Sequence, residues 1–344
     1  MSHFCMPPLI FPAPEPARLP LRIQPAFIPF QGCPARCIFC AQTLQTGQGI
    51  VPVRVVLDRL KGELDQAKER LEIAFYGGTF TLLPLAEQKE CLALAAVYKT
   101  KGIVTGVRAS TRPDAIDSSR LAALREAGLD MLELGVQSFD NSSLAASKRG
   151  YDADAAAQGC ALVKASGLAL GIQLMPGMPG MAGDAFRRDM EKALSFSPDA
   201  LRLYPCLVLA DTPLAELYAQ GAFTPWTLEK IAPLLAGAQE QAWEAGIRII
   251  RIGLAPQAEL ASGGIMAGPY HPALGSLVRG LALFAYIAGK METARPLQKL
   301  SVPKRFQGEF WGHRGSLKDA YGKRGLTKEN VVWSDEDHFT AWQG

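Results

Sequence analysis

Three cysteines fall within eight residues, in the segment Cys33-Pro-Ala-Arg-Cys37-Ile-Phe-Cys40. This spacing lets one loop turn three thiolates toward a single centre. A structural zinc site takes four ligands, and no second cysteine or histidine pair follows at a workable distance. An iron–sulfur cluster held by three thiolates leaves one iron open to bind a substrate or a cofactor directly. The residues therefore favour a cluster of this kind, with zinc as the alternative.

The other four cysteines, Cys5, Cys91, Cys160 and Cys206, are scattered along the chain. An odd total of seven argues against a disulfide framework. The last three lie in apolar or alanine-rich runs, where a free thiol behaves as a small buried hydrophobic group. We expect these three to have no part in the chemistry.

Further polar residues recur where predicted strands end. The paired glycines Gly77 and Gly78, followed by Thr79, would let backbone groups approach a small ligand closely, although an ordinary turn would use the same residues. Glu133 and Gln137 alternate with apolar residues on a buried strand, so we expect them to point inward, toward either a ligand or a structural partner. The remaining candidates at strand ends are Ser110, Arg112, Gln173, Arg202 and Tyr204.

Six short apolar runs alternate with longer helical patterns between about residues 22 and 206. The predicted strands are Ile23–Phe30, Leu71–Tyr76, Ile103–Ser110, Met131–Val136, Leu168–Leu174 and Leu201–Pro205. The predicted helices, with apolar residues repeating at three and four, are Val55–Arg70, Pro84–Tyr98, Ser118–Ala127, Asp152–Ser166 and Asp184–Phe196. Such alternation predicts parallel strands with right-handed crossovers. In barrels of this kind the chemistry lies at the carboxyl ends of the strands, where the cysteine loop also falls.

The sequence therefore predicts an α/β fold: a partial, six-unit (β/α) barrel resembling a TIM barrel, with a smaller C-terminal α/β domain. We expect a proline-rich, extended and partly mobile arm at residues 1–21, the barrel at 22–215 and the second domain at 216–344. In the second domain the pattern predicts a helix at Leu228–Ala245, a strand at Ile247–Ile252 and a helix at Leu277–Ile287. The 344 residues are 48% hydrophobic and 20% charged, which is enough apolar sequence for a sizeable core.

The composition also narrows the class of protein. The formal net charge is +3, which excludes a histone-like polycation but permits a local basic patch. Because no run of 18 apolar residues occurs, we expect no membrane span. The first 25 residues contain seven prolines and lack the apolar core of a signal peptide, so a cytoplasmic protein is expected.

Six segments together resemble the radical S-adenosylmethionine (SAM) superfamily, in the branch of the Elongator catalytic subunit and oxygen-independent coproporphyrinogen oxidase. They cover roughly residues 24–220, and the similarity is greater on the Elongator side. The segments are IPFQGCPARCIFCAQ, FYGGTFT, STRPDAI, LELGVQSFDNSSLAASKRG, GIQLMPGMPG and LRLYPCLVLADTPLAELY.

The resemblance implies that Cys33, Cys37 and Cys40 hold a [4Fe-4S] cluster. It places Phe39 near the SAM adenine and Arg149 on the SAM carboxylate, for which a guanidinium fork has suitable geometry. It also implies that Gly77, Gly78 and Thr79 bind the SAM amino group and that Gln137 faces the ribose. We add Ser110, Arg112, Glu133, Gln173 and Tyr204 as candidate SAM contacts, because they share the same end of the predicted barrel.

The implied activity is reductive cleavage of SAM to a 5′-deoxyadenosyl radical, which abstracts hydrogen from a substrate such as a tRNA nucleoside. A low-potential electron donor of the flavodoxin or ferredoxin type is implied as a partner. Two departures from the branch stand out. Ser110 and Thr111 occupy the position of a SAM-binding Glu in the coproporphyrinogen oxidases. The acetyltransferase domain of Elongator-type subunits would need about 150 further residues, so we expect none in this chain.

Two other functions stay open on the sequence alone. A cluster-containing nucleic-acid-binding protein without radical chemistry would use the run 299–328, which has eight Lys or Arg residues against two acids. Aromatic side chains within that run suit RNA, and a solvated basic face is the alternative. A radical SAM enzyme acting on a tetrapyrrole-like small molecule is the other possibility. Tyr270 and His271, on a loop bracketed by prolines, are candidate catalytic residues at substrate entry, although His271 would equally serve as a helix cap.

Overall fold

The computed structural model describes residues 7–15, 22–258, 260–291 and 296–343. Its internal contacts divide the chain into two units, each discontinuous in sequence. The barrel unit comprises Leu19–Ile231 and Ile249–Pro272. The smaller unit comprises Met1–Arg18, Ala232–Arg248 and Ala273–Gly344.

The barrel unit is built on a sheet of seven parallel strands in the order β2-β3-β4-β5-β6-β7-β9. Their bounds are β2 Arg22–Phe27, β3 Leu71–Tyr76, β4 Val104–Thr111, β5 Met131–Gln137, β6 Ala169–Leu174, β7 Ala200–Leu203 and β9 Ile249–Ile252. All six strands predicted for the barrel are present. The seventh, β9, was assigned to the second domain from sequence, but it pairs with β7 and extends the barrel sheet. Within the described residues the two edge strands β2 and β9 do not pair, so the barrel is partial, as predicted.

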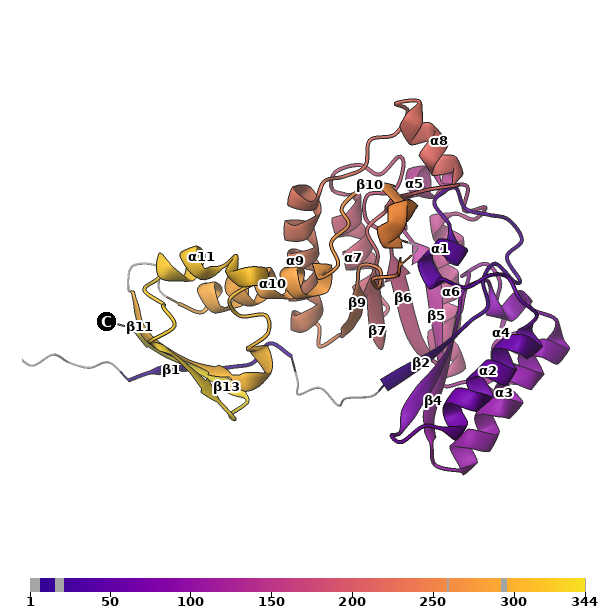
Figure 1. Ribbon diagram of the computed structural model, residues 1–344, viewed down its shortest axis with the longest axis horizontal. Coiled ribbons are helices and arrows are strands. Elements are labelled where there is room, and N and C mark those ends of the chain that lie inside the picture. Colours follow the sequence, from indigo (N-terminus) through magenta and orange to yellow (C-terminus); the bar gives the residue numbers. More distant parts are fainter. Residues whose placement is uncertain (1–6, 16–21, 259, 292–295, 344) are drawn as a thin grey trace, which may run out of the picture. The chain divides into compact units, whose positions relative to one another are not determined.

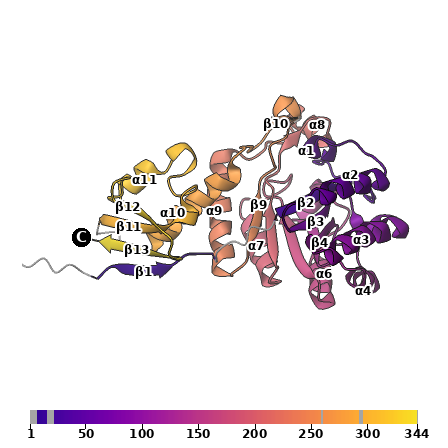
Figure 2. The same ribbon diagram turned by 60° about the horizontal axis from the view of Figure 1, so that its bottom comes forward.

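Five helices connect these strands: α2 Val53–Asp65, α3 Leu85–Thr100, α4 Ser118–Glu126, α6 Ala153–Ser166 and α7 Ala185–Ser195. Each lies at or near its predicted range. In α2 the buried residues Val53, Val56, Leu57, Leu60 and Leu64 follow the three-and-four spacing that packs a helix against a sheet. Asp117 and Asp152 cap α4 and α6 by accepting backbone hydrogen bonds. Figures 1 and 2 both show α2 and α3 side by side outside the sheet.

Several short elements interrupt the strand-to-helix connections, and the sequence pattern did not predict them. They are α1 Gln42–Thr46, η1 Phe80–Leu82, α5 Asn141–Ala146, β8 Val208–Leu209, α8 Pro213–Ala219, η2 Leu260–Gly264 and β10 Ile265–Ala267. β8 and β10 form a small antiparallel ribbon. α1, α8 and β10 lie at the same end of the barrel unit (Figure 1).

The smaller unit has a four-stranded sheet in the order β1-β13-β11-β12, with α10 and α11 over one face (Figure 1). Its elements are β1 Leu9–Pro12, α10 Leu274–Gly289, β11 Leu297–Pro303, η3 Lys304–Phe306, η4 His313–Gly315, α11 Lys318–Gly322, β12 Val331–Ser334 and β13 His338–Gln343. The predicted helix near residue 228 is α9, Leu228–Glu244, whose residues from 232 onward belong to this unit.

Part of the predicted N-terminal arm is a strand. β1 pairs with β13 in antiparallel register, and Phe11 is buried against Phe339, with ring centroids 5.2 Å apart. Residues 9–12 are therefore extended, as expected, but they form a paired strand that an apolar side chain anchors, not a free arm. The remainder at 1–6 and 16–21, which includes Cys5, lies outside the described residues.

Three of the four aromatic residues in the basic run 299–328 are core residues, and the fourth, Trp311, is half-buried. Phe306, Phe310 and Tyr321 are all buried, and the Phe310 and Tyr321 rings stack with centroids 4.3 Å apart. Rings enclosed in this way are not available to stack on RNA bases, which removes most of that support for a nucleic-acid-binding surface. Among the described residues, none of the helices has both the length and the apolar character needed to cross a membrane.

Candidate active site

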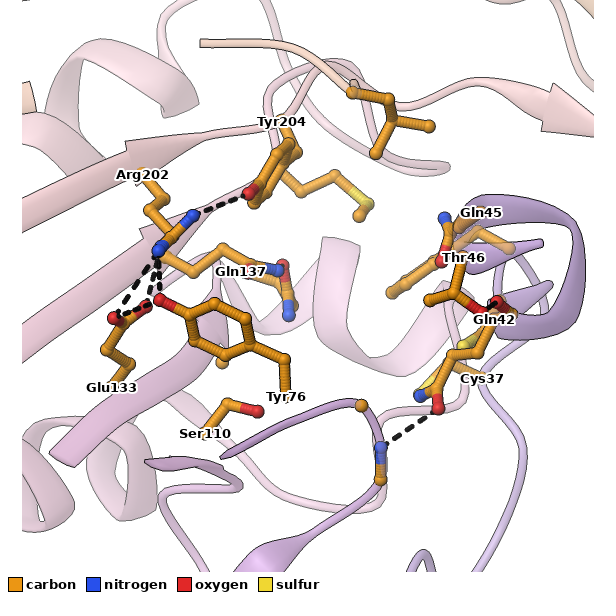
Figure 3. Close-up of a pocket in the computed structure, with 18 of the residues that line it drawn as sticks. Cys37, Gln42, Gln45, Thr46, Tyr76, Ser110, Glu133, Gln137, Arg202 and Tyr204 are labelled. Carbon is orange, nitrogen blue, oxygen red and sulfur yellow. Dashed lines mark hydrogen bonds and ion pairs between the residues drawn. The ribbon is translucent and has the colours of Figure 1, made fainter. Parts of the chain in front are cut away.

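A cavity of about 510 Å³ lies in the barrel unit at the carboxyl ends of the strands. Figure 3 shows Cys37, Gln42, Gln45 and Thr46 on one side of it and Tyr76, Glu133 and Arg202 on the other. Every residue predicted to bind the cluster or SAM lines this one cavity. They are Cys33, Cys37, Phe39, Cys40, Gly77, Gly78, Thr79, Ser110, Arg112, Glu133, Gln137, Arg149, Gln173 and Tyr204.

The cysteine loop between β2 and α1 brings three free thiols to the cavity wall. Cys37 Sγ accepts a hydrogen bond from Arg149 Nη1 at 2.9 Å, and Cys33 Sγ lies 3.4 Å from Thr79 Oγ1. Burial, together with the neighbouring Cys37 and Cys33, raises the pKa of Cys40 to about 12. Burial also raises the pKa of Cys33. Because burial and neighbouring thiols disfavour the ionised forms of Cys33 and Cys40, the loop suits a multivalent cationic centre, which would hold its ligands as thiolates.

The donor set fits a cluster better than a single ion. Among the described residues, no three His, Cys, Asp or Glu side chains are placed to hold one metal ion. A four-iron cluster needs no such convergence, because each thiolate binds a different iron. The apolar support for the loop is continuous, since Phe39 is buried in a cluster with Met175, Met178 and Val208. The residues present therefore fit the three-cysteine cluster that the sequence predicts.

The Gly77-Gly78 turn is joined to the cysteine loop by backbone and side-chain contacts. Gly78 has a φ of 60°, and a Cβ at this position would lie 2.1 Å from the Gln31 carbonyl oxygen, so only glycine fits. Gln42 Oε1 accepts hydrogen bonds from Gly78 N at 2.9 Å and from Phe30 N at 2.6 Å. This amide thus fixes the glycine turn and the start of the cysteine loop to each other.

Two arginines lie beside the thiols, and they differ in their partners. Arg112 donates through Nε and Nη2 to both carboxylate oxygens of Asp114, at 2.9 and 2.8 Å. Its charge is therefore balanced within the protein. Arg149 donates to the Gly135 carbonyl at 2.6 Å, to the Tyr151 hydroxyl and to Cys37, and none of these contacts is with a carboxylate. Arg149 is the better placed of the two to receive a ligand carboxylate.

Gln137 is the last residue of β5 and has a φ of 67°, a conformation that residues other than glycine rarely adopt. Its Oε1 accepts from Gln173 Nε2 at 3.1 Å. The next two residues, Ser138 and Phe139, donate hydrogen bonds to the buried carboxylate of Asp189, from Ser138 Oγ at 2.6 Å and from Phe139 N at 2.7 Å. Burial raises the pKa of Asp189 to about 6. The two hydrogen bonds that Ser138 and Phe139 donate to Asp189 on α7 thus fix the turn that presents Gln137 to the cavity.

Glu133 points into the barrel, as predicted, and its partners are protein side chains. Its Oε2 lies 2.6 Å from Arg202 Nε, and its Oε1 lies 3.2 Å from Arg108 Nη1 and 2.8 Å from the Tyr76 hydroxyl. Arg202 also donates to the Tyr204 hydroxyl at 3.0 Å. These contacts satisfy Glu133 without a ligand and orient Tyr76 and Tyr204 on the cavity wall.

Tyr270 and His271 lie elsewhere in the barrel unit. Tyr270 is half-buried against Ala41, Leu207, Leu209 and Leu260, beside the β8–β10 ribbon. Neither residue is among the described residues that line the cavity. Their catalytic role stays a prediction.

Sequence reasoning missed four polar residues that shape the site: Gln42, Tyr76, Arg108 and Tyr151. The Tyr151 hydroxyl is bonded to the Arg149 guanidinium and to the Gly135 and Val136 carbonyl groups. Their partners are 15 to 57 residues away in most cases, which local periodicity does not reveal. A usable signal existed for Tyr151, which is two residues after Arg149 in the segment Lys148-Arg149-Gly150-Tyr151.

Comparison with known proteins identifies the superfamily to which this chain is similar. The chain matches the radical SAM superfamily over residues 27–193 and the radical SAM C-terminal domain over residues 198–281. The tRNA uridine(34) acetyltransferase of Methanocaldococcus infernus is 26% identical over 251 residues, which cover 60% of this chain and 47% of that protein. The oxygen-independent coproporphyrinogen III oxidase of Paracoccus denitrificans is 32% identical over 187 residues, covering 52% and 41% of the two chains.

The solved structure of archaeal Methanocaldococcus infernus Elp3 with an N-terminal deletion superposes with a TM-score of 0.56 at 22% identity. It covers 78% of this chain and 63% of that one, and it supports the fold. The chain spans about half the length of the curated relatives that it matches. The two matched regions together extend from the end of β2 into α10. On these matches and on the cavity that the three cysteines share with the strand-end residues, the chain belongs to the radical SAM superfamily of enzymes.

Proposed function

We propose that this enzyme cleaves SAM reductively at a [4Fe-4S] cluster and abstracts hydrogen from a tRNA nucleoside. One observation carries the first half of the proposal. Three thiols, the Gly77-Gly78 turn, Gln137 and an arginine without a carboxylate partner all line a single cavity.

The residues that would hold the cluster are Cys33, Cys37 and Cys40. When bound, the cluster supplies one electron to SAM, which yields methionine and a 5′-deoxyadenosyl radical. The residues of the chain itself would bind SAM, orient it and support the loop that holds the cluster. Phe39 and its apolar neighbours support the cysteine loop.

Arg149 is the residue we assign to the SAM carboxylate, because its fork supplies two parallel donors. Tyr151 and the Gly135 carbonyl hold its guanidinium in place. Gly77 and Gly78 present backbone groups to the SAM amino group, and Gln137 faces the ribose. Ser110, Thr79, Gln173 and Tyr204 complete the proposed set of contacts from neighbouring strands.

The relatives favour a tRNA nucleoside as the substrate, since the Methanocaldococcus infernus protein is named a tRNA uridine(34) acetyltransferase. Exposed cations in the smaller unit offer contacts to phosphates of the RNA backbone. They are Lys299, Lys304, Arg314, Lys318, Lys323 and Lys328. A flavodoxin- or ferredoxin-type protein would supply the electron.

The test uses the full chain, reconstituted anaerobically with iron and sulfide and then reduced. We expect 5′-deoxyadenosine to form from SAM, and to form faster when bulk tRNA from cells lacking the gene is added. Mass spectrometry should also find a nucleoside that differs between tRNA from cells with and without the gene. A C37A protein is the matched control.

Each half of the proposal can fail separately. Formation of 5′-deoxyadenosine no greater than in the C37A protein would contradict SAM cleavage. Cleavage that tRNA does not stimulate, with identical nucleosides in the two strains, would contradict the substrate. Stimulation by a reduced tetrapyrrole instead would favour the other branch, to which the coproporphyrinogen oxidase belongs.

A further inference from the structure

The cavity extends well beyond the cysteine loop and reaches both edges of the barrel sheet. Its lining includes Phe27 and Pro25 of β2, and Ile250 and Arg251 of β9. These two strands are the unpaired edges of the seven-stranded sheet. The cavity therefore reaches the gap that a closed barrel would seal by hydrogen bonds between its first and last strands.

A β-bulge on β9 decides which side chains face this gap. Leu201 is paired with Ile249, but the next pair is Arg202 with Arg251, so Ile250 is an extra residue. Two residues of a bulged strand then face one residue of its partner. A register shift of one residue exchanges the two faces of a strand. Without the bulge, Arg251 would be paired with Leu203, which is fully buried on the face opposite to that of Arg202. The bulge thus turns Arg251 toward the cavity, beside Arg202.

The charges around the cavity are largely balanced by acids. Glu133 faces both Arg108 and Arg202, and Glu72 is ion-paired with Arg108. Asp114 balances Arg112 in the same way. Within this group each guanidinium therefore has a carboxylate partner, and no net charge remains for a ligand to neutralise.

Three further arginines of the lining have no ion pair with any described residue: Arg36, Arg149 and Arg251. Arg36 is exposed and lies over the Phe30 ring, 4.2 Å from its centroid. Arg149 is assigned above to the SAM carboxylate. Arg251 donates only through Nε, to the Gly253 carbonyl at 2.9 Å, and its two terminal nitrogens have no partner among the described residues. Two parallel donors at a half-buried position match an oxyanion.

We propose that Arg251 binds an oxyanionic group of the substrate, a phosphate or a carboxylate, with the adjoining part of the substrate packed on Phe27 and Ile250. The proposal rests on the proposed function to the extent that Arg149 is reserved for SAM. Arg202, which is paired with Arg251 in the sheet, lies across the pocket from Cys37 (Figure 3). The oxyanion subsite is therefore on the side of the cavity away from the thiols, at the open edge of the barrel.

Calorimetry on the full chain with SAM at saturation tests the subsite. Two pairs of probes separate the two kinds of oxyanion: uridine 5′-monophosphate against uridine, and 3-phenylpropionate against 3-phenylpropanol. We expect at least one anion to bind more tightly than its neutral counterpart. In R251Q its affinity should fall by about tenfold or more, the usual result of losing a charged hydrogen bond. R251K, which keeps the charge but not the fork, should restore part of it.

The matched control is R248Q, which neutralises an exposed arginine three residues earlier that is not part of the cavity lining. It should leave the binding of both anions unchanged. An equal loss in R248Q and R251Q would overturn the subsite in favour of general surface charge. So would equal binding of each anion and its neutral counterpart, or no measurable binding of either anion.

Failure of the subsite is distinguishable from failure of the proposed function. R251Q should keep the wild-type iron content, melting temperature and SAM affinity, because Arg251 contacts neither the cysteine loop nor Arg149. If anion binding depends on Arg251 but SAM is not cleaved, the subsite stands and the proposed reaction falls. If SAM is cleaved and R251Q binds both anions as the wild type does, the reaction stands and the subsite falls.

Discussion

The two units use charged and aromatic side chains in opposite ways. In the barrel unit Arg108, Arg112, Glu133, Arg149 and Asp189 are all buried, and three of them, Arg112, Glu133 and Arg149, line the cavity. In the smaller unit the buried large side chains are aromatic, with Phe306, Phe310, Tyr321 and Phe339 fully enclosed. Among the described residues, none of the buried charged side chains belongs to the smaller unit.

The difference shows what each unit is built to do. Burying a charge is costly unless it is paired, so an interior that contains several charges must be maintained by precise partners. Such an interior is useful where a polar ligand is to be held. An aromatic interior gains its stability from apolar area and ring packing and offers a ligand nothing charged. The chemistry is therefore expected in the barrel unit alone, and substitutions in the two units should affect different measurements.

The largest effect is expected at the thiols. Replacing Cys37 with Ala removes one of three cluster ligands, so the reconstituted protein should lose nearly all its bound iron and its brown colour. Cys160→Ala is the control, because Cys160 is also buried but lies on α6 and does not line the cavity. Iron and sulfide analysis provides the measurement. Full iron loading in the Cys37 variant would disprove the assignment of the ligands.

The next largest effect is expected in the aromatic interior of the smaller unit. Phe310→Ala should lower the free energy of unfolding by about 3–5 kcal/mol, the usual cost of a large cavity in a core. Trp311 and Trp333 lie 4.9 and 5.7 Å from the Phe310 ring, so urea unfolding can be followed by tryptophan fluorescence. Removing an exposed charge nearby with Lys318→Ala should change the free energy by less than about 0.5 kcal/mol. Equal losses in the two variants would contradict the comparison of interiors.

The charged interior of the barrel unit should be nearly as sensitive. Glu133→Gln leaves Arg108 and Arg202 with one carboxylate fewer, and breaking a buried ion pair costs about 3 kcal/mol or more. Glu191→Gln is a suitable control, since it breaks an exposed pair with Arg187 on α7 and should cost under about 0.5 kcal/mol. Denaturant unfolding measures both variants. A cost below about 1 kcal/mol for Glu133→Gln would show that the ion network is not needed for stability.

A smaller effect is expected on SAM binding. Arg149→Ala should weaken the binding of SAM by about 1.5–3 kcal/mol, the range for losing a charged hydrogen bond, while the iron content stays normal. Arg149→Lys should recover part of the loss, because it keeps the charge but not the fork. Equilibrium binding to the reconstituted protein tests this. An unchanged affinity would move the carboxylate contact to Arg112.

The smallest effect is a pH dependence from Asp189. Burial raises its pKa from 3.8 to about 6, so the folded protein holds this proton more tightly than the unfolded chain does. The resulting stabilisation is complete below pH 3.8 and is lost as the pH rises through about 6. An asparagine at position 189 does not titrate, but its side-chain oxygen can still accept the hydrogen bond from Phe139 N. The stability of Asp189→Asn relative to wild type should therefore increase by about 1 kcal/mol between pH 5 and pH 8 in urea unfolding. A pH-independent difference would show that Asp189 does not titrate in this range.

Local patterns predicted most of the barrel. The ranges of β3 and β5 agree with prediction to within one residue, because each is a short apolar run bounded by turn residues. The partner of a strand is not encoded locally, which is why β9 was assigned to the wrong unit. Ser110, Arg112, Glu133, Gln173 and Tyr204 were predicted from their position at strand ends, a rule that topology enforces. Phe39 and Arg149 were predicted from the family resemblance. Their roles toward SAM stay predictions.

Side-chain direction was the main information that the sequence lacked. Phe306, Phe310 and Tyr321 resemble a nucleic-acid surface by composition, yet they are packed inside the smaller unit. Arg202 and Arg251 were not predicted to be neighbours, because a one-residue bulge brings them to the same face. Composition reports which chemical groups are present, whereas register and bulges decide which of them meet.

The pairing of Leu9–Pro12 with His338–Gln343 has a consequence for synthesis of the chain. The partner of this early segment leaves the ribosome only after more than 300 further residues have been made. During that interval the barrel unit has all its strands and can fold as a unit, whereas Phe11 has no Phe339 to pack against. The smaller unit is therefore expected to complete its sheet last, after the barrel, and an exposed apolar segment near the start of the nascent chain is a point at which chaperones or aggregation would act first.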